Sequence, residues 1–171
     1  DWVIESEVEG YGTKITSCYI TQRHKGIEVY NAQSNVSIKD GKILRLENKF
    51  NSNIANKVNT FSPSLSVLEA ISKVYLLLGI NNSSAFTISQ TINNKTFKLA
   101  DGLQDDPISA KLVYQFVGEN SLRLAWAFQF YSPNGKSLWD LRIDALNGTI
   151  LEKNDLNLSC NFGELQHTNH N

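Results

Sequence analysis

The feature that most constrains the fold is a two-residue alternation of apolar and polar side chains, interrupted by tight turns. In the first third of the chain it predicts strands at residues 15–22, from Ile27 onward, and at 35–39 and 42–48. Asp40-Gly41 separates the last two and suits a type I′ hairpin, because both positions of that turn take a positive φ. Alternation between short turns predicts an antiparallel meander.

One segment has helical periodicity instead. Ser66 and Glu69 have the spacing of a capping box, in which each side chain satisfies a backbone N–H at the start of a helix. Apolar residues then recur at intervals of three and four, at Leu68, Ile71, Tyr75 and Leu78. Gly79 is placed to end the helix in the left-handed conformation. We therefore expect one amphipathic helix that buries its apolar side against a sheet.

Strands and turns resume after the helix. The predicted strands are 86–90, 96–99, 111–117, 122–131, 138–145 and 149–153. Asn93-Asn94 and Asn147-Gly148 are the expected hairpin turns, and residues 51–60 form a polar stretch that we interpret as a boundary. The order of elements predicts an α+β fold of antiparallel sheets with a helix packed on one face.

Composition and charge exclude several classes of partner. The chain has 171 residues, enough for one domain or two small ones. Its 16 Lys+Arg against 17 Asp+Glu leave no field that would attract nucleic acid or an anionic membrane. No apolar run approaches the roughly 20 residues of a membrane-spanning helix. We expect neither nucleic acid nor membrane as a partner, and a start at Asp1 predicts either a fragment or a processed product that has lost any targeting segment.

Two segments resemble a known family. Within residues 19–32, the polar end of one strand is followed by Gly26-Ile27-Glu28-Val29-Tyr30 at the start of the next. This segment is similar to the fungalysin/thermolysin propeptide (FTP) signature, with Lys25 in place of the usual Asn. Further along, Leu124-Ala125-Trp126 and the hairpin Ile143-Asp144-Ala145-Leu146-Asn147-Gly148 resemble the PepSY-like half that follows FTP in fungalysin precursors. The resemblance extends from about residue 16 to about residue 162.

The resemblance implies two cystatin-like units, secretion, and a precursor whose zinc metalloprotease domain lies outside this chain. It divides the chain into an FTP-like subdomain at 1–57, a PepSY-like subdomain at 58–158 and a flexible tail at 159–171. The implied partner is the catalytic domain of the same precursor, which the propeptide would inhibit and help to fold. Which surface makes that contact is not evident from the sequence.

The family-motif residues also have structural interpretations. Gly26 and Gly148 lie in turns where a positive φ is expected. Asp144 precedes a hairpin, and its carboxylate can accept a hydrogen bond from a backbone N–H of that hairpin. Ile27, Val29 and Tyr30 belong to the same motif strand. Trp126 alternates with apolar neighbours, so we expect packing in the core.

No catalytic or metal-binding residue is evident. The histidines are His24, His167 and His170, and none has the H-E-x-x-H spacing of a zincin. We therefore expect a non-catalytic chain without cofactors, with zinc only in the absent catalytic domain. Cys160 is the single candidate for a zinc-switch ligand, because a thiolate near the domain junction can bind the metal. The favoured alternative is a small buried hydrophobe.

Further alternatives stay open at the level of sequence. Cys18 and Cys160 either form a disulfide or are two free buried thiols. The chain is either a propeptide or a free-standing cystatin-like inhibitor or adhesion module. An enzyme would need a pocket of polar residues that are scattered in sequence.

Overall fold

The computed structural model describes residues 1–157, which form ten strands, one α-helix and one turn of 3-10 helix. In chain order the elements are β1 Trp2–Glu9, β2 Ile15–His24, β3 Ile27–Lys39, β4 Lys42–Glu47, η1 Ile54–Asn56, α1 Val67–Leu78, β5 Thr87–Asn93, β6 Thr96–Ala100, β7 Ile108–Phe116, β8 Leu122–Tyr131, β9 Leu138–Asp144 and β10 Ile150–Asp155.

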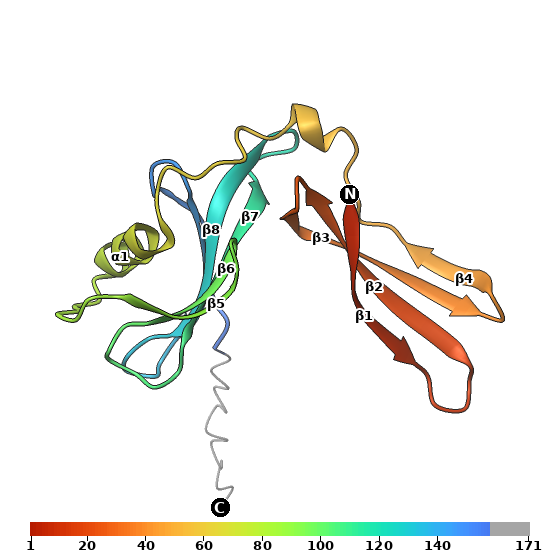
Figure 1. Cartoon of the computed structure of the whole chain (residues 1–171), viewed down its shortest axis with the longest axis horizontal. Helices are drawn as coiled ribbons and strands as arrows, with labels where there is room; N and C mark the ends of the chain where they lie inside the picture. Colours follow the sequence, from red (N-terminus) through yellow and green to blue (C-terminus); the bar gives the residue numbers. More distant parts are fainter. Residues whose placement is uncertain (158–171) are drawn as a thin grey trace, which may run out of the picture.

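All strands belong to one hydrogen-bonded sheet in the order β1-β2-β3-β7-β8-β9-β10. β4 pairs with β3, while β5 pairs with β6 and β6 pairs with β7. In Figure 1, β1–β4 lie to one side, and the strands from β5 onward lie with α1 on the other. The two groups meet where β3 and β7 run parallel, through Glu28↔Val113 and Val29↔Tyr114. The prediction of purely antiparallel sheets is wrong at this pair of strands. A tight turn indicates antiparallel pairing of the strands it joins, whereas β3 and β7 are far apart in sequence and no turn connects them.

A bend in β3 produces this junction. The ladder between β2 and β3 jumps from Thr21↔Gln33 to Arg23↔Glu28, so several residues of β3 lie opposite Gln22 alone. Asn31, within that stretch, has a φ of 60°, a left-handed conformation that Asn tolerates. The expectation of separate strands at Ile27 and at 35–39 is wrong for this reason, because one bent strand covers both. Its first half pairs with β7 and its second half with β4.

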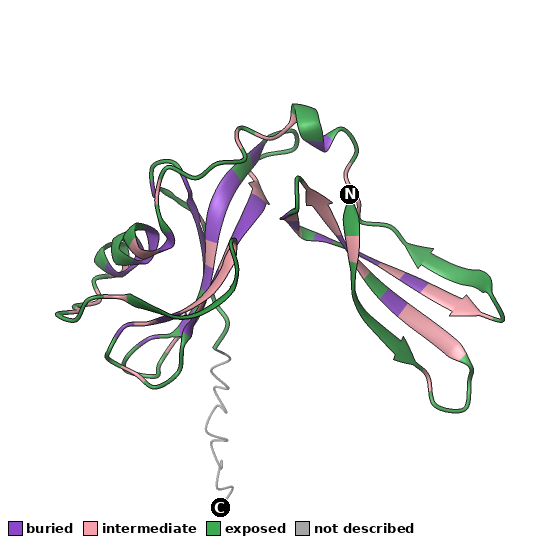
Figure 2. Cartoon of the chain, in the orientation of Figure 1, coloured by how far each residue is buried: buried purple, intermediate pink, exposed green. Residues whose placement is uncertain are grey.

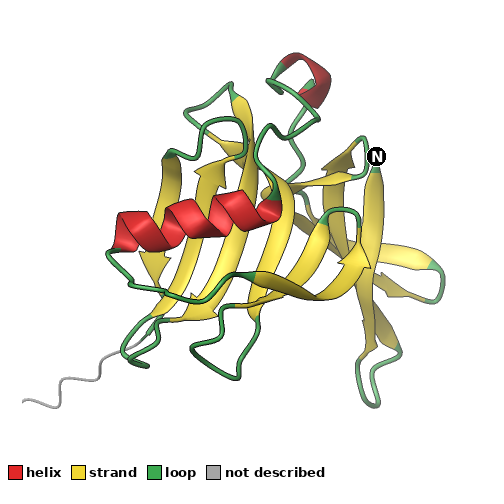
Figure 3. Ribbon diagram, turned by 60° about the vertical axis from the view of Figure 1, so that its left-hand side comes forward, coloured by secondary structure: helices red, strands yellow, loops and turns green. Residues whose placement is uncertain are grey.

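The main core lies between α1 and the sheet of β7–β9. The helix crosses the face of these strands (Figure 3), and it buries Ala70, Ile71 and Val74 against them. Burial is concentrated in β7, β8 and β9, whereas β4 is exposed along its whole length (Figure 2). Ile27, Val29 and Ile54 from the N-terminal part also belong to this core. The N-terminal strands therefore depend on the second group for part of their burial.

The described residues form a mixed, many-stranded sheet with one α-helix, which is consistent with the predicted α+β class. The capping box of α1 and the left-handed Gly79 are both present as predicted. The two cystatin-like units stay a prediction, since within residues 1–157 the strands β1–β4 carry no α-helix of their own. The boundary at residue 57 also stays a prediction, and the tail at 159–171 lies outside the described residues. Among described helices, none has the length and apolarity to cross a membrane.

Candidate functional site

The two family-motif segments meet at the β3–β7 junction. Glu28 on β3 forms an ion pair with Lys111 on β7. Two residues further along β3, the hydroxyl of Tyr30 donates to the carboxylate of Asp140 on β9 at 3.3 Å. The guanidinium carbon of Arg142 lies 4.2 Å from the centre of the Tyr30 ring, within the range of a cation–π contact. These side chains connect β3 to the polar face of the second strand group.

Arg142 is the centre of this cluster. Its side chain is only 2% exposed, and its Nη1 donates to Asp140 at 2.6 Å. The Nε atom has no partner among the described residues. Burial raises the pKa of Tyr30, and the neighbouring Asp140 carboxylate adds to the rise, while Arg142 opposes it. A neutral phenol held between an arginine and a carboxylate is suited to fixing two strands together, because the phenol donates to the carboxylate and its ring packs on the guanidinium.

The structure gives most motif residues positions in turns or in the core. Gly26 and Gly148 have φ values of 70° and 81°. Ile27 and Val29 are buried in the core. The indole Nε1 of Trp126 donates to the carbonyl of Leu65 at 2.9 Å, which ties β8 to the segment before α1.

Asp144 organises the turn after β9. The buried carboxylate accepts from Arg123 at 3.0 Å and from the backbone N–H of Leu146 at 2.8 Å. The carboxylate therefore pairs with an arginine and also fixes the backbone of the hairpin turn that follows it.

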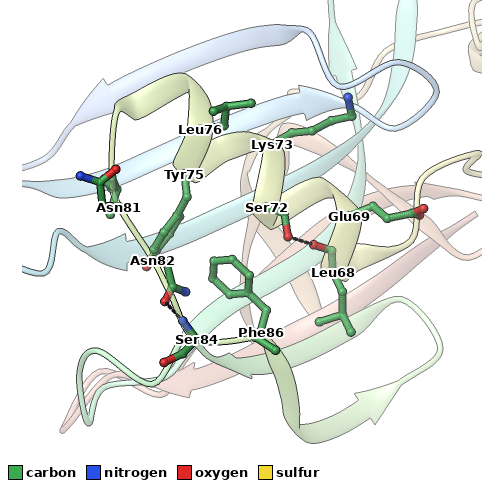
Figure 4. A pocket seen from close by; sticks show the side chains of 12 residues that line it. Leu68, Glu69, Ser72, Lys73, Tyr75, Leu76, Asn81, Asn82, Ser84 and Phe86 are labelled. Carbon is green, nitrogen blue, oxygen red and sulfur yellow. Dashed lines mark hydrogen bonds between the residues drawn. The ribbon is translucent and has the colours of Figure 1, made fainter.

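A groove runs beside α1. It has a volume of about 740 Å³ and lies between the helix and the segment that leads from it to β5. Figure 4 shows Leu68, Tyr75, Leu76 and Phe86 around this space, with Asn82 and Ser84 at one end. Phe86 packs edge-on against Tyr75, with ring centres 4.8 Å apart. Apolar side chains thus share the lining of the groove with polar ones, among them Glu69, Ser72 and Lys73.

Below the groove, Tyr75 anchors the loop that follows β6. Its hydroxyl donates to Asp101 at 2.6 Å, and Asp101 is 1% exposed. The same carboxylate accepts from the backbone N–H of Leu103 at 2.9 Å. Burial raises the pKa of Tyr75 strongly, and the hydrogen bond to Asp101 raises it further. This network holds the groove floor in place.

The solvent side of α1 carries exposed leucines. Leu76 is 80% exposed and Leu77 is 54% exposed. A second hollow, of about 400 Å³, lies between them and the β9–β10 turn, where Ile150 adds to the apolar wall. Together with the groove, these residues form a hollowed apolar surface, which we call the α1 face. Lys73 and Leu76 line both hollows, so the two hollows adjoin one another along the helix.

The other sequence candidates are scattered. Cys18 is buried in β2, whereas Cys160, His167 and His170 lie outside the described residues. The ring of His24 lies 6.1 Å from that of Tyr114. Within residues 1–157 no group of three or more His, Cys, Asp or Glu side chains could hold a metal ion.

Sequence reasoning missed Asp140 and Arg142. Together with Asp144 they alternate in charge along one strand, at every second residue. In the structure Arg142 and Asp144 are buried, and each pairs with an opposite charge, Arg142 with Asp140 and Asp144 with Arg123, because a buried charge is costly without a partner. The groove had no sequence signal, because it depends on the path of the chain after the helix.

Comparison with protein families concerns the N-terminal strands. Residues 5–50 carry the Fungalysin/Thermolysin Propeptide Motif. The matched segment runs from within β1 to just beyond β4, so the propeptide motif corresponds to the N-terminal strand group. It includes Tyr30 and Glu28, the residues that reach across the junction.

Among solved structures, the chain is similar to the Bacillus megaterium YpeB C-terminal domain. Sequence identity is 13% and the TM-score is 0.44, over 92% of this chain and 57% of that chain. The present chain therefore spans little more than half the length of that structure. No curated protein sequence matches the chain.

The propeptide motif implies a non-catalytic region of a protease precursor.

Proposed function

We propose that this chain is the propeptide of a secreted zinc metalloprotease, which binds its catalytic domain as an intramolecular inhibitor and folding assistant. The observation that carries the proposal is the propeptide motif at residues 5–50. Its physical support is the helix α1, which packs on the sheet and presents a hollowed apolar surface that suits a binding role.

In this proposal the α1 face is the docking surface. Leu76 and Leu77 project from a helix that is capped at both ends and packed on the sheet. Such a helix is fixed before binding, so little conformational entropy is lost when it contacts a partner. The hollows on either side of the leucines would receive side chains of the catalytic domain.

The same contact accounts for both proposed roles. A preformed surface that binds only the folded catalytic domain stabilises that fold by mass action. If the contact also covers the cleft, substrate is excluded until the propeptide is cleaved. Zinc would belong to the catalytic domain, which lies outside this chain, and the PepSY-like second half would supply α1.

The experiment is to express the whole precursor with Leu77→Asp, and to measure the yield of folded protease and the latency of the precursor. A buried charge opposite an apolar partner is costly, so we expect lower latency and lower yield. The matched control is Ile92→Asp on β5, since Ile92 is 53% exposed and Leu77 is 54% exposed. Equal effects of both substitutions, or no effect of either, would exclude the α1 face as the docking surface.

A further inference from the structure

Strand β4 forms an open edge. All six of its residues are exposed, and β3 is its only strand partner in the described part of the chain. Three large apolar side chains lie on it: Ile43 is 67% exposed, Leu44 56% and Leu46 57%. Figure 2 shows the whole strand as exposed. An edge with free backbone groups and apolar side chains is a template for pairing with another strand.

Two features normally protect such an edge, and β4 has both. Charged residues stand at Lys42, Arg45 and Glu47, and Leu44 is an extra residue where the register between β3 and β4 shifts. A bulge twists an edge and weakens random pairing. Charged side chains disfavour strand pairing only where two charges of the same sign lie opposite one another. The order of charges along β4 therefore decides which partner strands are excluded.

The order of charges fits a second copy of the same strand. We propose that β4 pairs antiparallel with β4 of another copy of this chain, about a two-fold axis between Leu44 and Arg45. This register places Lys42 opposite Glu47 of the partner copy, twice by symmetry. It also places Ile43 opposite Leu46 of the partner copy, again twice, and Leu44 beside the aliphatic part of Arg45. Both the charges and the apolar side chains are self-complementary, as a two-fold interface requires.

Neighbouring registers lose this match. A shift in one direction places Arg45 opposite Arg45 of the partner copy. A shift in the other direction places Lys42 opposite Leu46, with Glu47 beyond the end of the pairing. Of these three registers, only the central one joins unlike charges at both ends, and it also pairs all six residues of the strand, so electrostatic complementarity favours it.

The interface is small, which determines how it must be measured. A six-residue strand buries less than the roughly 800 Å² per partner of a standard interface, so we expect a weak dimer with a Kd of about 10–500 μM. This association is independent of the proposed docking to a catalytic domain, because it uses β4 and not the α1 face. Failure of either proposal therefore leaves the other unaffected.

The test is sedimentation equilibrium of the purified chain over a range of concentrations, for the wild type and two charge reversals. Lys42→Glu brings Glu opposite Glu in the dimer, and Glu47→Lys brings Lys opposite Lys. Each variant alone should dimerise about tenfold more weakly. An equal mixture of the two variants restores unlike charges at both ends, so the mixture should associate as well as the wild type.

The mixture separates specific pairing from misfolding, because a misfolded variant would not be rescued by another variant. Glu7→Lys on β1, the strand at the other edge of this group, is the charge control and should leave the dimer unchanged. A wild-type chain that stays monomeric at every concentration would overturn the proposal. So would a mixture that associates no better than its components, or a Glu7→Lys variant that weakens the dimer as much as the β4 variants.

Discussion

At Tyr75 a single hydroxyl supports a buried carboxylate. Replacing Tyr75 by Phe removes the donor at 2.6 Å from Asp101 and leaves that oxygen with a weak contact from Gln104 at 3.4 Å. An under-satisfied buried acceptor costs about 1–3 kcal/mol, so urea unfolding should show a loss of that size. The control is Tyr131→Phe, at an exposed tyrosine, where we expect a change of less than about 0.5 kcal/mol.

The same residue predicts a dependence of stability on alkaline pH. The pKa of Tyr75 is raised in the folded chain, so the folded state retains this proton more tightly than the unfolded state. Its contribution is complete below the ordinary tyrosine pKa of about 10 and is lost as pH rises above that value. Thermal unfolding between pH 8 and pH 11 should therefore decline less steeply for Tyr75→Phe. Parallel curves for the variant and the wild type would contradict the assignment.

We predict that substitutions at Arg142 and Asp140 have strongly non-additive effects on the free energy of unfolding. Arg142→Met leaves Asp140 partly buried without its guanidinium partner, which should cost about 3 kcal/mol. Removing the carboxylate as well, in Arg142→Met with Asp140→Asn, should recover part of that loss, because the uncompensated charge is gone. Chemical unfolding of both single variants and the double variant measures the coupling. Additive losses would show that the two residues act separately.

The helix α1 is stabilised by capping residues that are close to it in sequence, and these residues predict how much stability each substitution removes. The Ser66 hydroxyl accepts from the backbone N–H of Glu69 at 3.2 Å, so Ser66→Ala should cost about 1 kcal/mol. Ser72→Ala is the control: Ser72 lies within the same helix, and its hydroxyl donates only to the Leu68 carbonyl, so we expect no loss. Thermal unfolding followed by circular dichroism distinguishes them, and equal losses would contradict the role of the cap.

The cap also explains what the sequence could predict. Ser66, Glu69 and Gly79 act within a few residues of one another, so their pattern alone predicted the helix and its ends. The Asp40-Gly41 hairpin is local in the same way, with φ values of 49° and 71°. β1 was missed because an irregularity between Ile4 and Ser6 breaks its alternation of side chains. Pattern-based prediction therefore succeeds where the cause of a structure lies nearby in sequence.

Features that join distant segments were beyond the sequence. The parallel pairing of β3 with β7 depends on the bend near Asn31 and on burial of Val29 beside Tyr114. Neither strand indicates its partner, since both alternate in the same way. The Arg142 cluster and the groove beside α1 arise from the same tertiary contacts. Of the candidate site, the sequence thus predicted the motif and the helix but not the surface that they create.

For the whole molecule, the shared core predicts that the N-terminal part does not fold alone. Ile27, Val29, Ala32 and Ile54 bury their side chains in the core of the second group. A fragment of residues 1–57 would expose these apolar side chains to water, and small chains have little surplus stability. Its amide proton spectrum should be poorly dispersed. A well-dispersed spectrum would show instead that residues 1–57 form an independent domain.

In the proposed function, this chain binds and silences the catalytic domain of its own precursor. The most direct measurement is to titrate the separately purified catalytic domain with the folded chain and to follow hydrolysis of a peptide substrate. We predict saturable inhibition at one chain per catalytic domain, weakened by Leu77→Asp and retained with Ile92→Asp. Undiminished hydrolysis at high concentrations of folded chain would show that the chain does not inhibit the catalytic domain.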